Sequence, residues 1–480
     1  MSTTSRRTFL GWAAGAATAT VLGGRTSHAA ASSGVRVRKD VSELSASHPD
    51  IEAYKEAVRR MKALPANNPR SWLAQSRIHG MLGGGFGNCR HGSWHFLPWH
   101  RAYLHYFEEI CRELSGKPDF ALPYWDWSRT QSIPAHFFGA GNPLDNPSAT
   151  GNVGRQRGPM ETFSQQNLDE FVGLNVISAI LGNPDFETFA GGAVANINAR
   201  GTQGRLESVP HNFVHRWVGG DMATGGSPYD SIFWLHHCNV DRLWSEWSAR
   251  HPNSTPNDPL WLNGDYGGHF VDGEGMLVGS IQVRNLLDTA ALGYRYDTRS
   301  EAIAVAPQPL NLKIAALTAA APAASDGGLT FALAPNEEER AELAKVGEGA
   351  LSAPSVRIRL SGIEVPKNQD VSLRVFVNCE LLTESTPIDD PSYVGSCTFF
   401  SHGDHGHGDD SHGDGTASFF LNASPAFAKL YGDRPLKEDE PLKVSIVAVP
   451  LFPDDAERTW SGSVQELSPK QVQIDIITGS

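Results

Sequence analysis

The chain is short of cysteine and of positive charge, and it lacks a long hydrophobic run. Only five of its 480 residues are cysteines, too few for a scaffold held together by disulfides. Its 40 lysines and arginines are outnumbered by 53 aspartates and glutamates, and the formal net charge of −13 excludes nucleic acid as a partner. The remaining composition, 40% hydrophobic, suits a large globular protein without membrane insertion.

The first 31 residues have the pattern of an export signal. Ser5-Arg6-Arg7-Thr8-Phe9-Leu10 is followed by an alanine-rich apolar stretch to Leu22 and by small residues up to Ala31. This order predicts a twin-arginine signal peptide over residues 1–31, and therefore a periplasmic or secreted protein. The alternative is a membrane anchor, which the short and glycine-rich apolar stretch disfavours.

The length and a change of hydrophobic period predict two domains. A chain of 480 residues exceeds what one core normally organises. Residues 32–300 carry helical patterns, such as Ile51, Tyr54, Val58 and Met61 on one face, and predict a mainly α domain. A low-complexity, alanine-rich stretch predicts an exposed linker over residues 301–349. Alternating apolar residues then predict an all-β sandwich over residues 350–480, with strands near 356–360, 371–377, 442–446 and 472–476.

Histidines are grouped in two places of the helical part. His211 and His215 are four residues apart, which on a helix places both imidazoles on one face, and His237 lies on a second helical pattern, 232–247. These three predict one metal site. The other group contributes His100 on the pattern 98–114, His91 in the loop before it, and His79 on the pattern 71–81. These predict a second site.

Histidine-only coordination limits the choice of metal. Sites built from imidazoles without carboxylates suit zinc, copper, iron or nickel, and a lone three-histidine site would favour zinc. Two matched sites favour a dinuclear centre, which points to copper handling dioxygen. Histidines projecting inward from facing helices are how four-helix bundles build such centres. The alternative is that all six are ordinary core or surface histidines.

Four motifs carry a resemblance to a known family: His91-x8-His100-Arg101, Leu122-Pro-Tyr-Trp-Asp-Trp127, Pro210-His211-Asn212-x2-His215, and His236-His237-x3-Asp241-Arg242-x-Trp244. Through them the chain resembles the tyrosinase and polyphenol oxidase family of type 3 copper proteins. The resemblance implies a four-helix bundle holding two copper ions, with O2 as co-substrate and small phenols as substrates. It implies His79, His91 and His100 as ligands of the first copper, and His211, His215 and His237 as ligands of the second.

The same resemblance assigns further residues around the ligands. It favours His237 over His236 as the ligand, and it implies a thioether bond between Cys89 and His91, with a buried free cysteine as the alternative. Asp241 and Arg242 are expected to lie behind the ligands. Cys379 and Cys397 lie in the exported tail, and the sequence does not decide whether they form a disulfide.

Two further assignments concern phenol chemistry. Glu207 and Asn212 are expected to hold a water that takes the proton from a bound monophenol; a helix-capping role is the alternative for Glu207. Met222, Gly225 and Gly226 lie on a loop expected to form an open entrance over the second copper. Ser231 departs from the proline usual in the family.

The C-terminal part resembles the domain that covers the copper site in plant and some bacterial polyphenol oxidases, which predicts a latent proenzyme. Within it, His402, His405, His407 and His412 form a loop that either binds copper weakly or is simply solvated. We expect a copper enzyme that hydroxylates monophenols and oxidises o-diphenols to o-quinones. The alternatives are a catechol oxidase without monophenol activity, an oxygen-binding protein of hemocyanin type, or a β-domain binder with a degenerate bundle.

Overall fold

The computed structural model describes residues 34–81, 86–145, 162–297, 312–319, 322–325, 328–346, 354–400, 415–432, 436–437 and 440–479. Residues 34–480 belong to one unit of mutually contacting residues. The predicted export signal, 1–31, and the histidine-rich loop from His402 to His412 lie outside the described residues. Within the described ranges, no helix combines the length and the hydrophobicity that a membrane crossing requires.

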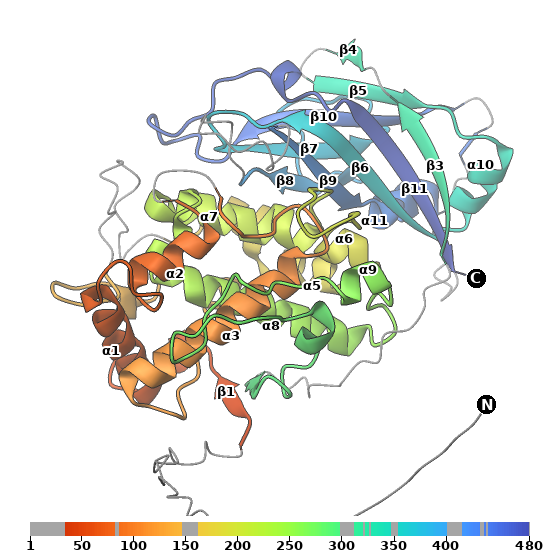
Figure 1. Ribbon diagram of the computed structural model, residues 1–480. Helices are drawn as coiled ribbons and strands as arrows, with labels where there is room; N and C mark the ends of the chain where they lie inside the picture. Colours follow the sequence, from red (N-terminus) through yellow and green to blue (C-terminus); the bar gives the residue numbers. More distant parts are fainter. Residues whose placement is uncertain are drawn as a thin grey trace, which may run out of the picture. The chain divides into compact units, whose positions relative to one another are not determined.

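The first part of the chain is helical (Figure 1). Its longer helices are α1 (Pro49–Ala63), α2 (Trp72–His79), α3 (Phe96–Ser115), α7 (Asn212–Val218) and α8 (Ile232–Arg250). Shorter ones are α4 (Gln165–Asn167), α5 (Leu174–Gly182), α6 (Phe186–Ala190) and α9 (Pro259–Leu262). Helix α3 packs against both α1 and α8, so it lies at the centre of the helical part.

The sequence of α3 explains this central position. Trp99, Tyr103, Phe107 and Ile110 recur at helical spacing, and all four are buried. The helix ends at Gly116, whose φ of 68° is the left-handed conformation that glycine adopts without strain. A short parallel pair, β1 (Arg36–Arg38) with β2 (Tyr294–Tyr296), joins the two ends of the helical part.

Two antiparallel sheets form the C-terminal part. One has the strand order β4-β5-β10-β7-β8 and the other β3-β11-β6-β9. The strands are β3 (Leu312–Ala319), β4 (Ala323–Ser325), β5 (Gly328–Leu333), β6 (Ser355–Glu364), β7 (Val371–Val377), β8 (Tyr393–Thr398), β9 (Thr416–Asn422), β10 (Leu442–Pro450) and β11 (Gln471–Gly479). Helices α10 (Glu337–Ala344) and α11 (Ser424–Tyr431) accompany them.

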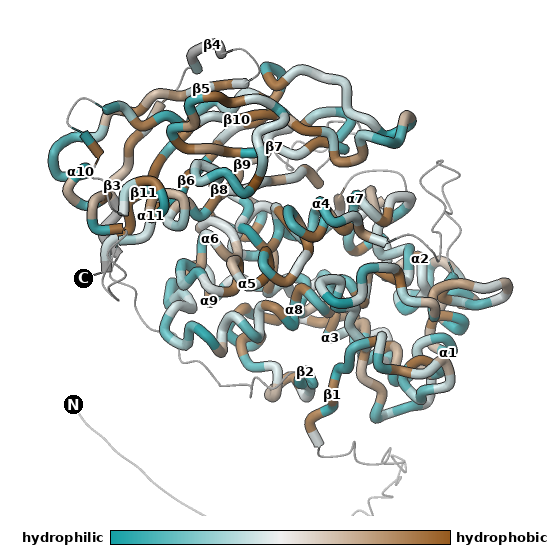
Figure 2. The backbone as a smooth tube through the Cα atoms, turned by 180° about the vertical axis from the view of Figure 1, so that it is seen from behind, coloured by the Kyte–Doolittle hydropathy of each residue, from teal (hydrophilic) through white to brown (hydrophobic). Residues whose placement is uncertain are grey.

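A common core confirms the predicted sandwich. Val375 and Ile446 from one sheet and Ile358 and Ile474 from the other are fully buried in one hydrophobic cluster. Figure 2 shows hydrophobic stretches in brown along both the helices and these strands. The four strands expected from alternating residues are present as β6, β7, β10 and β11.

The predicted linker over residues 301–349 is wrong for much of its length. Residues 312–319 form β3, which pairs with β11, and residues 328–333 form β5, which pairs with β10. Leu317 and Phe331 from these strands are buried in the sandwich core. Alanine has a low strand propensity and weakens the visible alternation, so the segment looked like a linker. Hydrogen bonding to β11 and β10 stabilises these two strands despite the low propensity of their alanines.

Candidate metal centre

Two groups of buried histidines face one another inside the helical part. His79, His91 and His100 form one group, and His211, His215, His236 and His237 form the other; within each, the potential ligand atoms lie within 4.8 Å of one another. The groups meet where His100 and His237 stack, with ring centroids 4.3 Å apart. The structure therefore brings together all six histidines that the sequence singled out, and adds His236.

The elements hold these histidines from several directions. His79 ends α2, His91 lies in the loop before α3, and His100 follows the first turn of α3. His211 ends a π-helical turn, Glu207–His211, whereas a regular helix was expected there. Pro210 lies inside this turn and has no N–H to donate, which explains the departure from α-helical bonding. The rings of His211 and His215 are nonetheless 4.5 Å apart.

Four of the histidines are oriented by a hydrogen bond from their Nδ1 atoms. The pairs are His79 with the carbonyl of Gly225 (2.8 Å), His100 with that of Phe96 (2.8 Å), His215 with that of Met222 (2.7 Å), and His211 with Oδ1 of Asn212 (2.8 Å). Each acceptor fixes the hydrogen on Nδ1, so Nε2 keeps its lone pair. Such outer contacts are how proteins aim imidazole ligands at a metal.

The same reasoning separates His236 from His237. The indole N–H of Trp127 donates to Nδ1 of His236 at 3.0 Å, so a neutral His236 carries its hydrogen on Nε2 and has no lone pair there. Nε2 of His237 instead lies 3.3 Å from Nε2 of His215. This geometry supports the prediction that His237, and not His236, is a ligand.

The residues present fit a metal of the copper or zinc type. Nε2 of His91, His100 and His211 is buried, and none of these atoms has a hydrogen-bond partner among the described residues. Burial lowers the pKa of His211 to about 3 and holds the pKa values of His91 and His100 well below the usual range. Neutral, buried nitrogens without partners are costly unless a metal ion accepts their lone pairs.

Cys89 lies beside His91. Its sulfur is 3.5 Å from Nδ1 of His91, and burial raises the pKa of the thiol. The two side chains are therefore close, and the thioether between them stays a prediction. Cys379 and Cys397 are both free thiols, and Cys397 is buried.

Glu207 is fully buried next to the loop that carries His91. Both of its carboxylate oxygens accept the backbone N–H of Gly92, at 2.8 and 3.0 Å. The bond reaches across to another segment, which disfavours the alternative of a local helix cap. Burial raises the pKa of Glu207 to about 8.

Asn212 is engaged on all sides. Its Oδ1 accepts from His211, and its Nδ2 donates to Oε1 of Gln203 at 2.9 Å and to the carbonyl of Thr398 at 2.8 Å. Thr398 is the last residue of β8, so the sandwich contacts the histidine cluster through this amide.

The glycine loop was predicted as an open entrance, yet Met222, Gly225 and Gly226 are all buried in the structure. The carbonyls of Met222 and Gly225 instead orient His215 and His79. Sequence reasoning missed this role because a backbone carbonyl leaves no signal in residue type.

Asp241 and Arg242 lie behind the histidines on α8. Asp241 accepts hydrogen bonds from Arg101 at 2.6 Å and from Tyr294 at 2.7 Å. Arg242 donates to Asn239 at 2.7 Å and pairs with Asp126 at 3.3 Å. Both residues thus brace α8 against its neighbours.

Phe400, which sequence reasoning also missed, covers the histidines. Its ring stacks on His215 with centroids 4.1 Å apart and an interplanar angle of 17°, and it meets His91 edge-on at 5.9 Å. The cavity left beside His91 and Phe400 is about 20 Å3, room for a water but not for a phenol ring. The sequence carries no signal for this role: Phe399 and Phe400 are adjacent aromatic residues, and only the fold shows that Phe399 faces the sandwich core while Phe400 meets the histidines.

Comparisons with known proteins agree with this centre. The family model for the common central domain of tyrosinase matches residues 69–177 and 155–250. A tyrosinase of Hahella sp. (strain CCB-MM4) is 32% identical over 303 residues, which is 55% of this chain and 63% of that protein. The matched region is about half the length of two plant polyphenol oxidases.

Solved structures share the fold. Latent apple tyrosinase matches with a TM-score of 0.62 and 21% identity, over 93% of this chain and 97% of that one. A functional unit of octopus hemocyanin matches with a TM-score of 0.52 and 18% identity, over 93% of this chain and all of that one. The family implies an oxidoreductase with copper, and the histidines present fit it. The chain belongs to the tyrosinase and polyphenol oxidase family.

Proposed function

We propose that this protein hydroxylates monophenols ortho to the hydroxyl group and oxidises o-diphenols to o-quinones with O2. The observation that carries the proposal is the pair of facing histidine clusters, with oriented Nε2 atoms, beside the buried carboxyl of Glu207. His79, His91 and His100 would hold one copper ion, and His211, His215 and His237 the other. Two copper ions, when bound, supply the site where dioxygen and a phenol react.

We assign proton transfer to Glu207 and Asn212. A phenol has a pKa near 10, so at neutral pH a nearby base must take its proton before it binds as phenolate. The carboxyl of Glu207 has its pKa raised to about 8, between that of an ordinary carboxyl and that of a phenol. The amide of Asn212 would help Glu207 to hold the water that relays this proton. A diphenol oxidation makes a weaker demand on such a base.

The contacts of Phe400 and Thr398 support a latent form. Phe400 occupies the space over His215 and His91, while the carbonyl of Thr398 takes a hydrogen bond from Asn212. A phenol could approach only after these residues move away. The same contacts would also keep Asn212 from its proposed role, so latency would affect access and proton transfer together.

Two covalent events complete the proposal. The twin-arginine signal over residues 1–31 would export the chain, and Cys89 would form a thioether with His91. The C–S bond would replace the S–H of Cys89 and one C–H of the His91 ring, with O2 as the oxidant that takes up the two hydrogen atoms. The copper-matured protein should therefore be lighter than its own sequence mass by two hydrogen atoms, whereas Cys89→Ala should match its sequence mass.

The test compares 4-methylphenol with 4-methylcatechol, using copper-loaded protein whose C-terminal part has been removed by limited proteolysis. We expect oxygen uptake and quinone formation with both. Glu207→Gln should lower monophenol turnover by about a hundredfold and diphenol turnover by only a few-fold, because one general base contributes roughly that factor. Glu113→Gln, which changes an exposed carboxyl on α3, serves as the matched control.

The other outcomes assign other functions. Turnover of the diphenol alone would make the protein a catechol oxidase. A stable oxygenated absorption band without turnover of either phenol would favour oxygen binding of the hemocyanin type, whose fold is shared. Equal losses with both substrates in Glu207→Gln would remove the proton-relay role from Glu207.

A further inference from the structure

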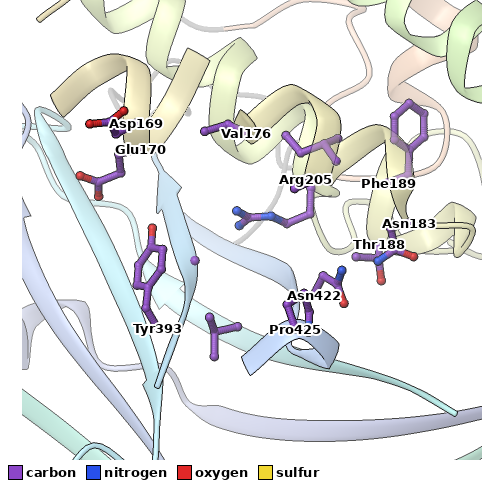
Figure 3. Close-up of a pocket in the computed structure, with 14 residues that line it drawn as sticks. Asp169, Glu170, Val176, Asn183, Thr188, Phe189, Arg205, Tyr393, Asn422 and Pro425 are labelled. Carbon is purple, nitrogen blue, oxygen red and sulfur yellow. The ribbon is translucent and has the colours of Figure 1, made fainter. Parts of the chain in front are cut away.

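A second cavity lies away from the histidines, between the helical part and the sandwich (Figure 3). Its volume is about 150 Å3. Residues of α5 and α6 line one side, and residues of β8, β9 and α11 line the other. None of the residues proposed for phenol oxidation contributes to its lining.

One side chain in this cavity carries a charge that is not matched by an acid. Arg205 donates to the carbonyl of Ser396 at 2.6 Å, and no described carboxylate forms an ion pair with it. Its surroundings lower the pKa of Arg205, chiefly through burial. In Figure 3 its guanidinium extends toward the ring of Tyr393. Arg205 is half-buried, and partial removal of a guanidinium from water favours an accompanying anion.

The nearby acids are already committed or exposed. Glu170 makes two hydrogen bonds with Arg374, at 2.9 and 2.7 Å, so its charge is balanced there. Asp169 is exposed at the rim and accepts a hydrogen bond from Gln165 at 2.8 Å. Water screens the charge of Asp169, so it opposes an anion in the cavity only weakly. Arg205 therefore makes the inner part of the cavity positive.

The remaining walls are mostly apolar. Val176, Ile180 and Phe189 come from the helical part, and Val394 and Pro425 come from the sandwich. A cavity of about 150 Å3 with apolar walls is the size that holds a single benzene ring. A ligand that satisfies both features has one ring and one negative group at its edge.

We propose that this cavity binds a small aromatic carboxylate, with its carboxylate on Arg205 and its ring between Phe189 and Val394. Arg–carboxylate pairs are planar and two-pronged, and the N–H groups of Arg205 other than the one given to Ser396 remain for this purpose. Because both parts of the chain line the site, the ligand binds only while they are docked. It therefore holds the sandwich over the histidine clusters.

The binding test is isothermal titration of the full-length, copper-loaded chain with benzoate, which has no ring hydroxyl to oxidise. We expect one benzoate per chain with a Kd of about 1 mM or tighter, and no binding of the neutral analogue benzyl alcohol. Arg205→Gln removes the charge and should abolish binding. Ala179 is exposed on α5 and lines the cavity, so the larger ring in Ala179→Phe should fill the cavity and abolish benzoate binding too.

Ser178→Phe is the matched control, since Ser178 is exposed on the same helix but does not line the cavity. It should bind benzoate like the unmodified chain. Binding that survives in Arg205→Gln or in Ala179→Phe would place benzoate elsewhere, for example at copper, and would overturn the proposal. The absence of binding to the unmodified chain would overturn it as well.

The effect on docking has a readout that needs no activity. The backbone N–H of Gln203 donates to the backbone carbonyl of Ser418, and the backbone N–H of Phe420 donates to the backbone carbonyl of Gln203. Both bonds cross between the two parts. At a benzoate concentration ten times Kd, hydrogen exchange of these amides should slow about tenfold. Unchanged exchange at saturation would show that the ligand does not hold the parts together. This result is independent of the proposed phenol oxidation.

Discussion

The difference between His236 and His237 comes from one indole N–H. Trp127 donates to Nδ1 of His236, which leaves the hydrogen of that ring on Nε2, while Nε2 of His237 faces Nε2 of His215. Two adjacent residues of the same type, both fully buried, thus present different ring nitrogens, and we expect only His237 to bind a metal. Their order in the sequence does not contain this information; the neighbouring aromatic side chain does.

Replacing each of these histidines by glutamine tests the assignment. His237→Gln should lower bound copper from about two ions per chain to about one, because the second site keeps only two imidazoles. His236→Gln should keep both ions, since the amide oxygen still accepts from Trp127. Metal analysis after dialysis gives the count. A loss of copper in His236→Gln with retention in His237→Gln would reverse the assignment.

At the scale of elements, one carboxylate joins two of the helices that carry the histidines to the short β1–β2 pair. Asp241 on α8 bonds Arg101 on α3 at 2.6 Å and Tyr294 on β2 at 2.7 Å, and it pairs with Arg38 on β1 at 3.3 Å. Burial opposes ionisation of Asp241, but Arg101 and Arg38 outweigh it and hold the pKa of this carboxyl below its usual range. The charge of Asp241 therefore stabilises the folded state.

Removing this charge should be costly. Asp241→Asn leaves Arg38 and Arg101 buried without their shared partner, and we expect a loss of about 3–5 kcal/mol in the unfolding free energy of the helical part at neutral pH. Urea titration followed by tryptophan fluorescence measures it. Glu52→Gln removes an exposed charge from α1 and should change stability by less than about 0.5 kcal/mol.

The pH dependence of stability follows from the difference between the folded and unfolded pKa of Asp241. The folded pKa of Asp241 lies below the unfolded value of about 4, so its contribution is complete above that pH and is lost as the pH falls through the folded pKa. The unmodified chain should therefore lose more stability below about pH 4 than Asp241→Asn does. Parallel acid curves for the two proteins would contradict this account.

Elements with a strong period could be predicted from sequence, and those held by partners could not. The patterns 71–81, 98–114 and 232–247 became α2, α3 and α8 because apolar residues repeat along one face of each. Strand β3 escaped notice because its alanines alternate weakly and its pairing with β11 decides its structure. The carbonyls of Met222 and Gly225 and the ring of Phe400 escaped notice because tertiary packing alone brings them to the histidines.

At the scale of the whole molecule, buried ion pairs join the helical part to the sandwich. Glu170 pairs with Arg374 at 2.7 Å, and Arg216 pairs with Asp370 at 2.7 Å. Asp370 precedes β7 and Arg374 lies within it, while Phe400 follows β8, the neighbour of β7 in the sheet. In the proposed latent form these pairs are made only while the parts are docked, so we expect them to set the fraction of chains with uncovered histidines.

Weakening one pair should therefore activate the intact chain. Arg374→Met leaves Glu170 buried and unpaired in the docked form, whereas water solvates it after opening. A cost of about 3 kcal/mol would raise the open fraction about a hundredfold. Diphenol oxidation by the uncleaved protein should rise with it, and so should the rate at which a protease separates the two parts. Lys345→Met, which breaks an exposed pair, should change neither rate.

Phe400→Ala distinguishes whether Phe400 blocks the histidine site or holds the sandwich against the helical part. The substitution removes the ring that stacks on His215 but leaves the pairs of Glu170 and Asp370 in place. If Phe400 acts mainly by filling the site, diphenol oxidation by the intact chain should rise by a larger factor than protease separation does, because removing the ring uncovers His215 in the docked form as well. Equal increases in both rates would show that Phe400 acts by fastening the sandwich, and no increase in either would place the barrier to phenols elsewhere.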